Sequence, residues 1–280
     1  SGSDLHLAAG LEPRIRKHGE LEPIAGMSPL RDEELKSLLV EIASPRQWET
    51  YCTTNDLDFA YGLEGVARFR ANYFRQENGA AAVFRIIPEK IVPLEDLKLP
   101  PGIETFVHLE QGLVLVTGPT GSGKSTTLAS IVDKINSTYA KHIVTIEDPI
   151  EFVHPNKKST LSQREVGADT ESFSAALRAA IRQDPNVILV GEMRDLETIA
   201  LAITAAEMGM LVFGTLHTNN ASKTIDRVID VFPTDQQKQV RTMLSVSLSG
   251  IVSQLLMRTG DGHGRVAVNE LLLKTSSLAN

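Results

Sequence analysis

The sequence predicts an α/β domain preceded by a small α+β domain, and three observations lead to this prediction. After residue 102, short apolar runs alternate with segments of helical periodicity, as in a parallel sheet covered by helices. A glycine-rich loop at residues 118–125 lies between one such run and a helical segment. Four prolines between residues 88 and 102 separate this part from a mixed pattern upstream. We therefore expect an N-terminal domain at 1–87, a proline-rich linker at 88–102 and the α/β domain at 103–280.

Length and composition restrict the class of protein. The chain has 280 residues, 42% of them hydrophobic and 22% charged, which is typical of soluble globular domains. No apolar run approaches the roughly 20 residues of a transmembrane helix, and residues 1–10 do not form a secretory signal. The single cysteine, Cys52, excludes an internal disulfide and a four-cysteine zinc site, so we expect a cytoplasmic protein. The net charge of −7 disfavours a large nucleic-acid interface.

The N-terminal part contains one helical and two strand signals. Apolar side chains recur at helical spacing, at Leu35, Leu38, Leu39 and Ile42. With three acidic residues in its first turn, this segment predicts a helix over 32–43. Alternating residues predict strands over 66–75 and 81–87, joined by a turn at Asn78-Gly79. An antiparallel sheet with a helix is the expected result.

The second part contains the signals of a buried parallel sheet. Its strands are predicted at the apolar runs 113–116, 143–146, 187–190 and 211–213. A helix is predicted over 173–181 from its apolar periodicity. Thr234 and Gln237 have the spacing of a capping box. Apolar residues from Val240 to Leu255 then predict one long amphipathic helix.

The glycine-rich loop matches the phosphate-binding pattern G-x-x-x-x-G-K-[ST] at every fixed position. Its residues are Gly118, Pro119, Thr120, Gly121, Ser122, Gly123, Lys124 and Ser125, with Thr126 next in the chain. The glycines allow backbone N–H groups to surround phosphates at the start of a helix predicted over 124–135. Lys124 is expected to reach the β- and γ-phosphates of ATP, and the Ser125 hydroxyl to hold Mg²⁺. The match and its context favour this interpretation over a chance glycine-rich turn.

Acidic residues and a histidine follow the other core strands. Glu192 comes just after the run 187–190, where a P-loop enzyme carries the acid that handles magnesium or the attacking water. Glu147, Asp148 and Glu151 follow the run 143–146, and His217 follows the run 211–213. Ligands of open α/β sheets bind at the carboxyl ends of strands, so these side chains are expected near the phosphates. A solvated acidic loop and a structural histidine are the alternatives.

Arginines gather on one predicted strand of the N-terminal part. Strict alternation places Arg68 and Arg70 on one face and Phe69 on the other, with Arg85 on the companion strand. This face is compatible with plain solvation. It also fits a subunit that presents cations to a neighbour's γ-phosphate.

Taken together, these segments resemble the secretion-ATPase superfamily, and most closely its twitching-motility (PilT-type) retraction ATPases of type IV pili. The resemblance covers nearly the whole chain. The segments that carry it are Gly65–Arg70, the loop 118–125, Thr145–Phe152, Gly191–Asp195 and Gly214–Thr218.

The resemblance implies a PAS-like N-terminal domain joined to a RecA-like ATPase domain, assembled as a ring-shaped homohexamer. It implies that Glu192 is the catalytic base, that Glu151 and His217 line the site, and that Arg68, Arg70 and Arg85 contact nucleotide. It further implies an inner-membrane pilus platform protein as partner and a location at the inner face of the cell membrane. The family carries a further C-terminal helical motif, which we expect to be truncated at Asn280.

Other functions remain open from the sequence. A pilus-assembly or type II secretion ATPase typically has a tetracysteine loop, which one cysteine cannot build, and Met193 also favours the retraction type. An accessory retraction paralogue is a further alternative. A nucleic-acid translocase is disfavoured by the net acidity, and a non-catalytic scaffold by the intact Lys124, Ser125 and Glu192.

Overall fold

The computed structural model describes residues 2–17, 19–63, 66–87, 90–260 and 264–274. The chain divides into two compact units, at residues 1–89 and 90–280, and each is described by itself. The predicted C-terminal end after Lys274 and the first two residues of the predicted linker lie outside the described residues. In the part of the chain that the structure describes, no helix is long and apolar enough to cross a membrane.

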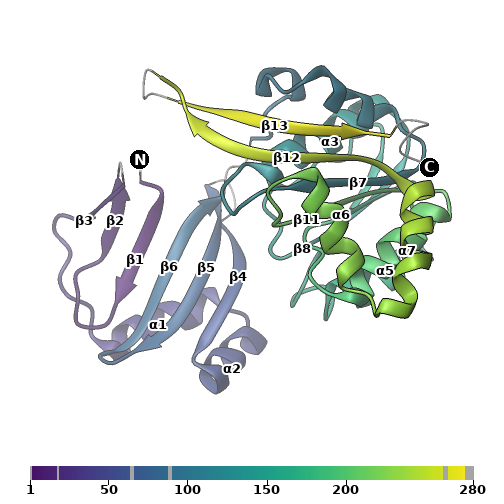
Figure 1. The fold of residues 1–280 in the computed structure, drawn as a ribbon. Helices are drawn as coiled ribbons and strands as arrows, with labels where there is room; N and C mark the ends of the chain where they lie inside the picture. Colours follow the sequence, from purple (N-terminus) through teal and green to yellow (C-terminus); the bar gives the residue numbers. More distant parts are fainter. Residues whose placement is uncertain (1, 18, 64–65, 88–89, 261–263, 275–280) are drawn as a thin grey trace. The chain divides into compact units, whose positions relative to one another are not determined.

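The first unit is a six-stranded antiparallel sheet with two helices (Figure 1). The strand order is β3-β2-β1-β6-β5-β4. The strands are β1 (Asp4–Ala8), β2 (Arg14–Lys17), β3 (Glu20–Pro23), β4 (Asp56–Leu63), β5 (Ala67–Gln76) and β6 (Gly79–Ile87). The helices are α1 (Asp32–Ile42) and α2 (Pro45–Thr54). The predicted helix, both predicted strands and the turn between them are present to within two residues.

Alternation along β5 decides which face of this sheet is buried. Ala71 and Tyr73 are fully buried and pack with Leu35 and Leu39 of α1 and with Tyr51 of α2. The intervening residues of β5 face the other side of the sheet, because successive side chains of a strand point to opposite faces. The arginine-bearing face predicted from the sequence is therefore the face that does not carry the core.

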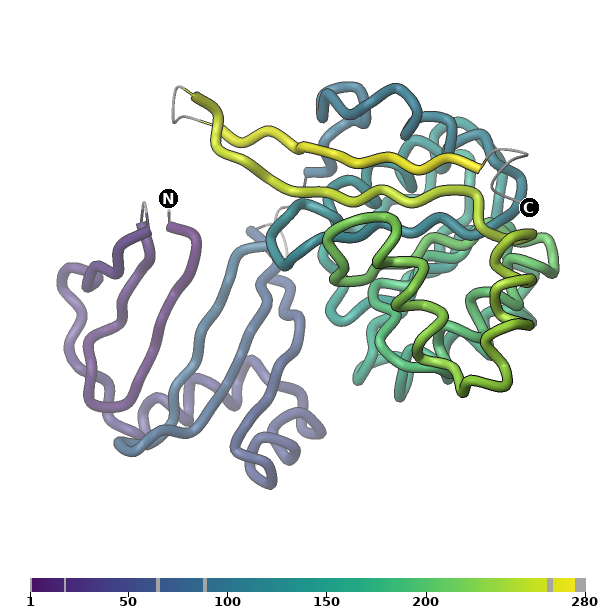
Figure 2. Tube along the Cα trace, in the orientation of Figure 1, coloured from purple at the N-terminus to yellow at the C-terminus, as the bar shows by residue number. Residues whose placement is uncertain are grey.

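The second unit is a seven-stranded sheet in the order β13-β12-β7-β11-β10-β8-β9. Its strands are β7 (Gly112–Thr117), β8 (His142–Glu147), β9 (Thr160–Glu165), β10 (Val187–Val190), β11 (Leu211–Leu216), β12 (Leu248–Arg258) and β13 (Arg265–Leu273). All neighbours are parallel except β12 and β13, which run along one edge as the long yellow pair in Figure 2. The parallel sheet predicted from the sequence is confirmed.

Helices cover both faces of this sheet. One face packs against α4 (Phe173–Ala180), α5 (Leu196–Glu207), α6 (Ala221–Asp230) and α7 (Thr234–Ser247). The other packs against α3 (Lys124–Thr138) and the 3₁₀ helices η1 (Leu94–Leu97) and η2 (Pro101–His108). Along β7, Leu113 and Leu115 enter the first layer, and Val114 and Val116 the second. Because both faces of these strands are buried, their sequences are continuous apolar runs.

The predicted linker is largely part of the second unit. From residue 90 onward it contains η1 and the start of η2. Leu94 of the linker is buried in the same cluster as Ile103 and Phe106, which follow it in the chain. Prolines 93, 100 and 101 stand at or just before the starts of these short helices, where a missing N–H costs nothing. The division of the chain into functional domains stays a prediction.

The prediction of one long helix from Val240 to Leu255 is wrong. Helix α7 ends at Ser247, and β12 begins at the next residue. Residues 250–253 of β12 pair with β7, and Ile251 and Val252 are buried on opposite faces. Apolar residues at 248, 251, 252 and 255 fit a helical period, but pairing with the central sheet decides the structure. The predicted capping box is also absent: Pro233 precedes the helix, and Gln237 Nε2 donates to the carbonyl of Phe232 at 3.1 Å.

Candidate functional site: the phosphate loop and the strand ends beside it

The phosphate loop connects the end of β7 to the start of α3. Gly118, Gly121 and Gly123 have φ values of 143°, 78° and 86°, which L-residues with a side chain rarely adopt. Gly123 is the N-cap of α3, and no side chain caps its free N–H groups. These N–H groups and the positive end of the helix form a cradle for an anion. Ser125 and Thr126 lie in the first turn of the helix.

The side chain of Lys124 folds back onto the start of this loop. Its Nζ donates to the carbonyls of Gly118 at 2.8 Å and Pro119 at 3.1 Å, and only 9% of the residue is exposed. Burial lowers the pKa of Lys124, while the carboxylates of Glu192 and Glu151 counteract that shift. The structure therefore brings Lys124, Glu192 and Glu151 within electrostatic reach of one another. A largely buried ammonium group beside uncapped N–H groups fits the phosphates of a nucleotide.

The donor set also fits a magnesium ion bound through the nucleotide. Among the described residues no group of three or more His, Cys, Asp or Glu side chains is placed to hold a metal alone. Mg²⁺ needs only one or two protein ligands when phosphate oxygens and water supply the others. The hydroxyl of Ser125, one residue after Lys124, is the protein ligand that this arrangement offers.

Glu192 lies two residues after β10 and is contacted by an arginine and a histidine. Its Oε1 is 2.9 Å from Nε2 of His217 and also accepts a hydrogen bond from Nε of Arg194. Burial by itself would raise the pKa of Glu192, but Arg194 and His217 outweigh burial and lower the pKa. Glu192 is therefore ionised at neutral pH. The sequence predicts that residues following the core strands lie close together. Glu192, after β10, and His217, after β11, do so.

The loop that carries Glu192 is fixed to β11 at two points. Met193 donates its N–H to the carbonyl of Thr215 at 3.0 Å, and the Thr215 hydroxyl donates to the carbonyl of Gly191. The Met193 side chain is 2% exposed and lies where a Cβ on Gly214 would sit, 2.1 Å from its sulfur. Glycine at 214 is therefore required for this packing. These contacts hold the loop that carries Glu192 against the end of β11, and His217 follows directly after β11.

The three acidic residues at the end of β8 and just after it have different surroundings. Glu147 accepts hydrogen bonds from the Thr145 hydroxyl at 2.7 Å and from the N–H of Glu151 at 3.4 Å, so it shapes its own loop. Desolvation raises the pKa of Glu147 in spite of these bonds. Asp148 and Glu151 are exposed. Of the three, Glu151 is the one whose charge acts on Lys124.

The predicted arginines lie in the first unit, where Arg70 and Arg85 form ion pairs. Arg70 is directly opposite Arg85 in the β5–β6 register, and Arg68 is two residues along the same face. Arg70 Nε donates to both carboxylate oxygens of Asp58, at 3.2 and 3.1 Å, and Arg85 Nε donates to Asp4 at 2.7 Å. These three arginines therefore lie on one face of the sheet, as the sequence predicts. Their contact with a nucleotide stays a prediction.

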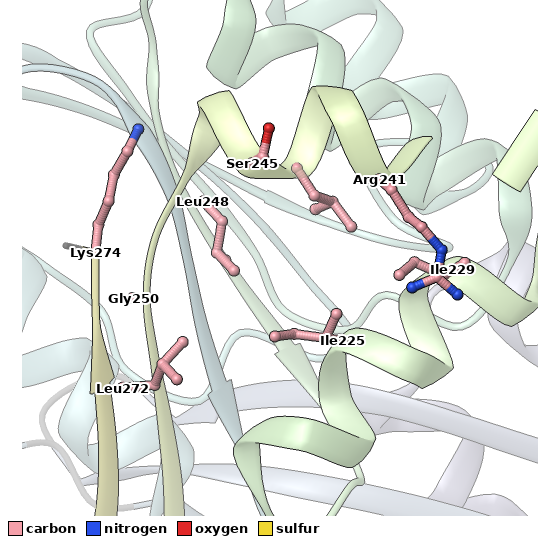
Figure 3. A pocket seen from close by; sticks show the side chains of 9 residues that line it. Ile225, Ile229, Arg241, Ser245, Leu248, Gly250, Leu272 and Lys274 are labelled. Atoms are coloured by element: carbon pink, nitrogen blue, oxygen red, sulfur yellow. The ribbon is translucent and has the colours of Figure 1, made fainter. Parts of the chain in front are cut away.

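A cavity of about 250 Å³ lies elsewhere in the second unit, among α6, α7, β12 and β13 (Figure 3). Ile225, Leu248 and Leu272 line it, and Arg241 and Lys274 extend along opposite sides of it. None of its lining residues belongs to the phosphate loop. Its apolar lining does not resemble a phosphate site, so we place the candidate nucleotide at the loop.

Sequence reasoning did not identify two residues of the site: Arg194, which contacts Glu192, and Gln254, which contacts the loop. Arg194 stands in the quoted segment 191–195, and a cation two residues after Glu192 is a signal that could have identified it. Gln254 contacts the loop from β12. Because that segment was interpreted as helix, no local pattern linked it to the loop.

The fold and the site define a P-loop nucleotide-binding protein with a mixed α/β core. Comparison with known proteins is more specific. Residues 57–277 match the type II/IV secretion system protein family. The chain is 52% identical over 278 residues to the type IV pilus retraction ATPase PilT of Pseudomonas aeruginosa, covering 99% of this chain and 80% of that protein. A twitching motility protein of Neisseria gonorrhoeae is 51% identical over 268 residues, 96% of this chain and 71% of that protein.

A solved structure agrees with these relatives. The crystal structure of the pilus retraction motor PilT with bound ADP superposes with a TM-score of 0.95 at 48% identity, covering 100% of this chain and 81% of that one. The chain belongs to the type II/IV secretion system protein family, and the α/β secretion-ATPase fold expected from the sequence is confirmed.

Proposed function

We propose that this chain is an ATP-hydrolysing motor that drives retraction of type IV pili and so twitching motility. The proposal is supported by identity over nearly the full chain to a retraction ATPase and by the fold of a retraction motor that binds ADP. The single observation that carries the chemistry is the group formed by Lys124, Glu192 and Glu151 at the strand ends beside the loop.

The residues of this site take separate roles in hydrolysis. The N–H groups at the start of α3 and the Lys124 ammonium would bind the β- and γ-phosphates, and Ser125 would hold the Mg²⁺. When bound, magnesium would neutralise negative charge on the phosphates. Glu192 is the general base: Arg194 and His217 both contact Oε1, and in the described chain no hydrogen bond reaches Oε2, which is left for water. Glu151 adds negative charge near Lys124.

We further propose that the active form is a ring of six copies, with Arg68, Arg70 and Arg85 completing a nucleotide site in trans. The ring would act at the inner face of the cell membrane through an inner-membrane pilus platform protein. The family resemblance supports both statements. In the first unit, the arginines lie together on one face of the sheet and away from its core, as a surface for such contacts requires.

Hydrolysis and assembly can be tested on the purified chain. Lys124→Ala removes the only cation of the loop, so phosphate release should fall to background and ATP should bind far more weakly. Lys134→Ala is the matched control, because Lys134 lies on the same helix and pairs with Glu95 at the surface. Near-normal turnover of Lys124→Ala would remove the loop from the mechanism. Native mass spectrometry should show hexamers favoured by nucleotide, and a fully active monomer would contradict the ring.

Deletion of the gene in the organism that carries it separates retraction from pilus assembly. Loss of a retraction motor should leave cells with abundant pili and without twitching. Cells that lose their pili altogether would contradict the proposal and indicate an assembly motor. Unchanged piliation and unchanged twitching would argue for an accessory paralogue.

A further inference from the structure

A buried glutamine of β12 lies against the phosphate loop. Gln254 is 2% exposed, and its strand is the neighbour of β7, which leads into the loop (Figure 1). Its Nε2 donates to the carbonyl of Ser122 at 2.7 Å, and its Oε1 accepts from the hydroxyl of Thr127 at 2.9 Å. One side chain therefore joins the loop, the first turns of α3 and β12.

The orientation of this amide is decided by its partners. A backbone carbonyl only accepts hydrogen bonds, so the NH₂ end of Gln254 must face Ser122. The carbonyl end then faces Thr127, whose hydroxyl donates to it. Reversing the amide would place two oxygens together at Ser122. The two contacts thus support one another.

This contact determines where the next N–H of the loop points. In a planar trans peptide the C=O and the following N–H point in opposite directions. The Ser122 carbonyl is held toward β12, so the N–H of Gly123 points away from β12. Among the described residues, no protein acceptor takes this N–H. It is one of the donors that the cradle presents to an anion.

The other side of the loop is closed by the backbone of β12. A Cβ on Gly118 would lie 2.2 Å from the carbonyl oxygen of Gln254, and one on Gly123 would lie 2.9 Å from its Nε2. No phosphate can enter from that side. The Gly123 N–H consequently points toward the side from which a phosphate can approach.

We propose that Gln254 is a positioning residue of the phosphate loop, which holds the Ser122–Gly123 peptide in the orientation that binds phosphate. The proposal rests on the proposed nucleotide-binding function. It adds to that function a contact from a residue 132 positions away in the chain. The contact also couples β12 to the nucleotide site, because a shift of this strand along β7 would move the Gly123 N–H.

A neighbouring hydrogen bond provides the comparison that separates positioning from simple stability. Ser253, also on β12, shares a buried 2.9 Å hydrogen bond with the hydroxyl of Thr117. This bond joins β12 to β7 without touching a peptide of the loop. Ser253→Ala should therefore lower stability without changing nucleotide affinity.

The test measures the dissociation constant of fluorescent ADP and, without nucleotide, the midpoint of thermal unfolding. Gln254→Met keeps the length of the side chain and removes both hydrogen bonds. It should weaken ADP binding roughly ten- to a hundredfold, since the lost bonds orient a donor to a charged ligand. Thr127→Val should weaken binding less, and Thr127→Ser, which keeps the hydroxyl, should restore it.

Gln254→Glu adds a signature that a purely structural role would not produce. A carboxylate presents an oxygen to the Ser122 carbonyl, whereas the protonated acid can donate to it. The affinity of Gln254→Glu relative to the unmodified chain should therefore improve as the pH is lowered. Gln254→Met should show no such relative change.

The outcomes separate this proposal from the proposed function. An unmodified chain that binds neither ADP nor ATP overturns both. If the unmodified chain binds ADP and Gln254→Met binds it equally well, only the positioning role of Gln254 is overturned. The same holds if Gln254→Met and Ser253→Ala lose affinity alike, in proportion to their thermal destabilisation.

Discussion

In Glu192, one carboxylate oxygen, Oε1, is held by hydrogen bonds, and the other, Oε2, is left available. Burial alone would raise the pKa of this carboxyl, but Arg194 and His217, which both contact Oε1, lower it. A base for hydrolysis has to be ionised at working pH and correctly aimed. Arg194 and His217 meet these two requirements through the same pair of contacts.

Glu192→Gln tests this role. It should leave nucleotide binding largely intact and reduce turnover by roughly two to four orders of magnitude, the range for a lost general base. Steady-state phosphate release and an ADP titration measure the two effects separately. Glu197→Gln is the matched control, because Glu197 lies five residues on and pairs with Arg178 at the surface. Normal hydrolysis by Glu192→Gln together with an inactive Glu151→Gln would transfer the role to Glu151.

His154 makes the stability of the second unit depend on pH. It is 9% exposed, and burial lowers its pKa to about 4, with Asp133 acting against burial and Lys157 with it. In the unfolded chain its pKa is the ordinary 6.5, so the unfolded state takes up the proton first as the pH falls. Stability present above pH 6.5 should be lost progressively toward pH 4, by up to about 3 kcal/mol.

Urea unfolding at a series of pH values measures this loss. His154→Gln should flatten the slope between these limits, and the same substitution at the exposed His108 controls for removal of a histidine. An unchanged slope in His154→Gln would show that other groups titrate in this range.

At the scale of the elements, the sequence predicts best the strands that are buried on both faces. The runs 113–116, 143–146, 187–190 and 211–213 all lie within central parallel strands. Edge strands β9 and β13 are only partly buried and carry polar residues, so no continuous apolar run marks them. In β12 the apolar spacing fits a helix and a strand equally, and only pairing with β7 decides between them.

The same limit applies to the candidate site. The phosphate loop, Glu192 and His217 follow from local motifs placed at strand ends, and the structure brings Glu192 and His217 together. Gln254 approaches the loop because β12 lies beside β7, a pairing between residues far apart in the chain. Arg194 reaches Glu192 through a side-chain conformation that spacing alone does not specify. Contacts that depend on the tertiary structure, such as those of Gln254 and Arg194, therefore could not be predicted from the sequence.

At the scale of the whole molecule, the question is whether the arginines of the first unit serve a site in another copy. Arg70 and Arg85 are paired with Asp58 and Asp4, so solvation of an ion-paired surface accounts for them within one chain. A role in trans predicts something more: substitution should damage a site to which these residues do not belong in sequence. The PAS-like character of this unit stays a prediction.

Mixing two inactive variants separates these possibilities. A Lys124→Ala subunit has an inactive loop and intact arginines, and an Arg68→Ala/Arg70→Ala subunit has the reverse. If the arginines act in trans, each variant alone should lose about 10³ to 10⁵ in kcat, and some activity should return in mixed rings. An arginine-deficient subunit would then receive its cations from a Lys124→Ala neighbour.

The experiment needs proof of mixing and a control for the surface. Co-purification of two differently tagged variants shows that mixed rings form. Arg75→Ala, on β5 but on its opposite face, should retain full activity alone, because its strand position directs it away from Arg68 and Arg70. If mixed rings form and remain inactive, the arginines act within their own chain. If Arg68→Ala/Arg70→Ala is fully active alone, they are a solvated face and the ring needs no cation from this surface.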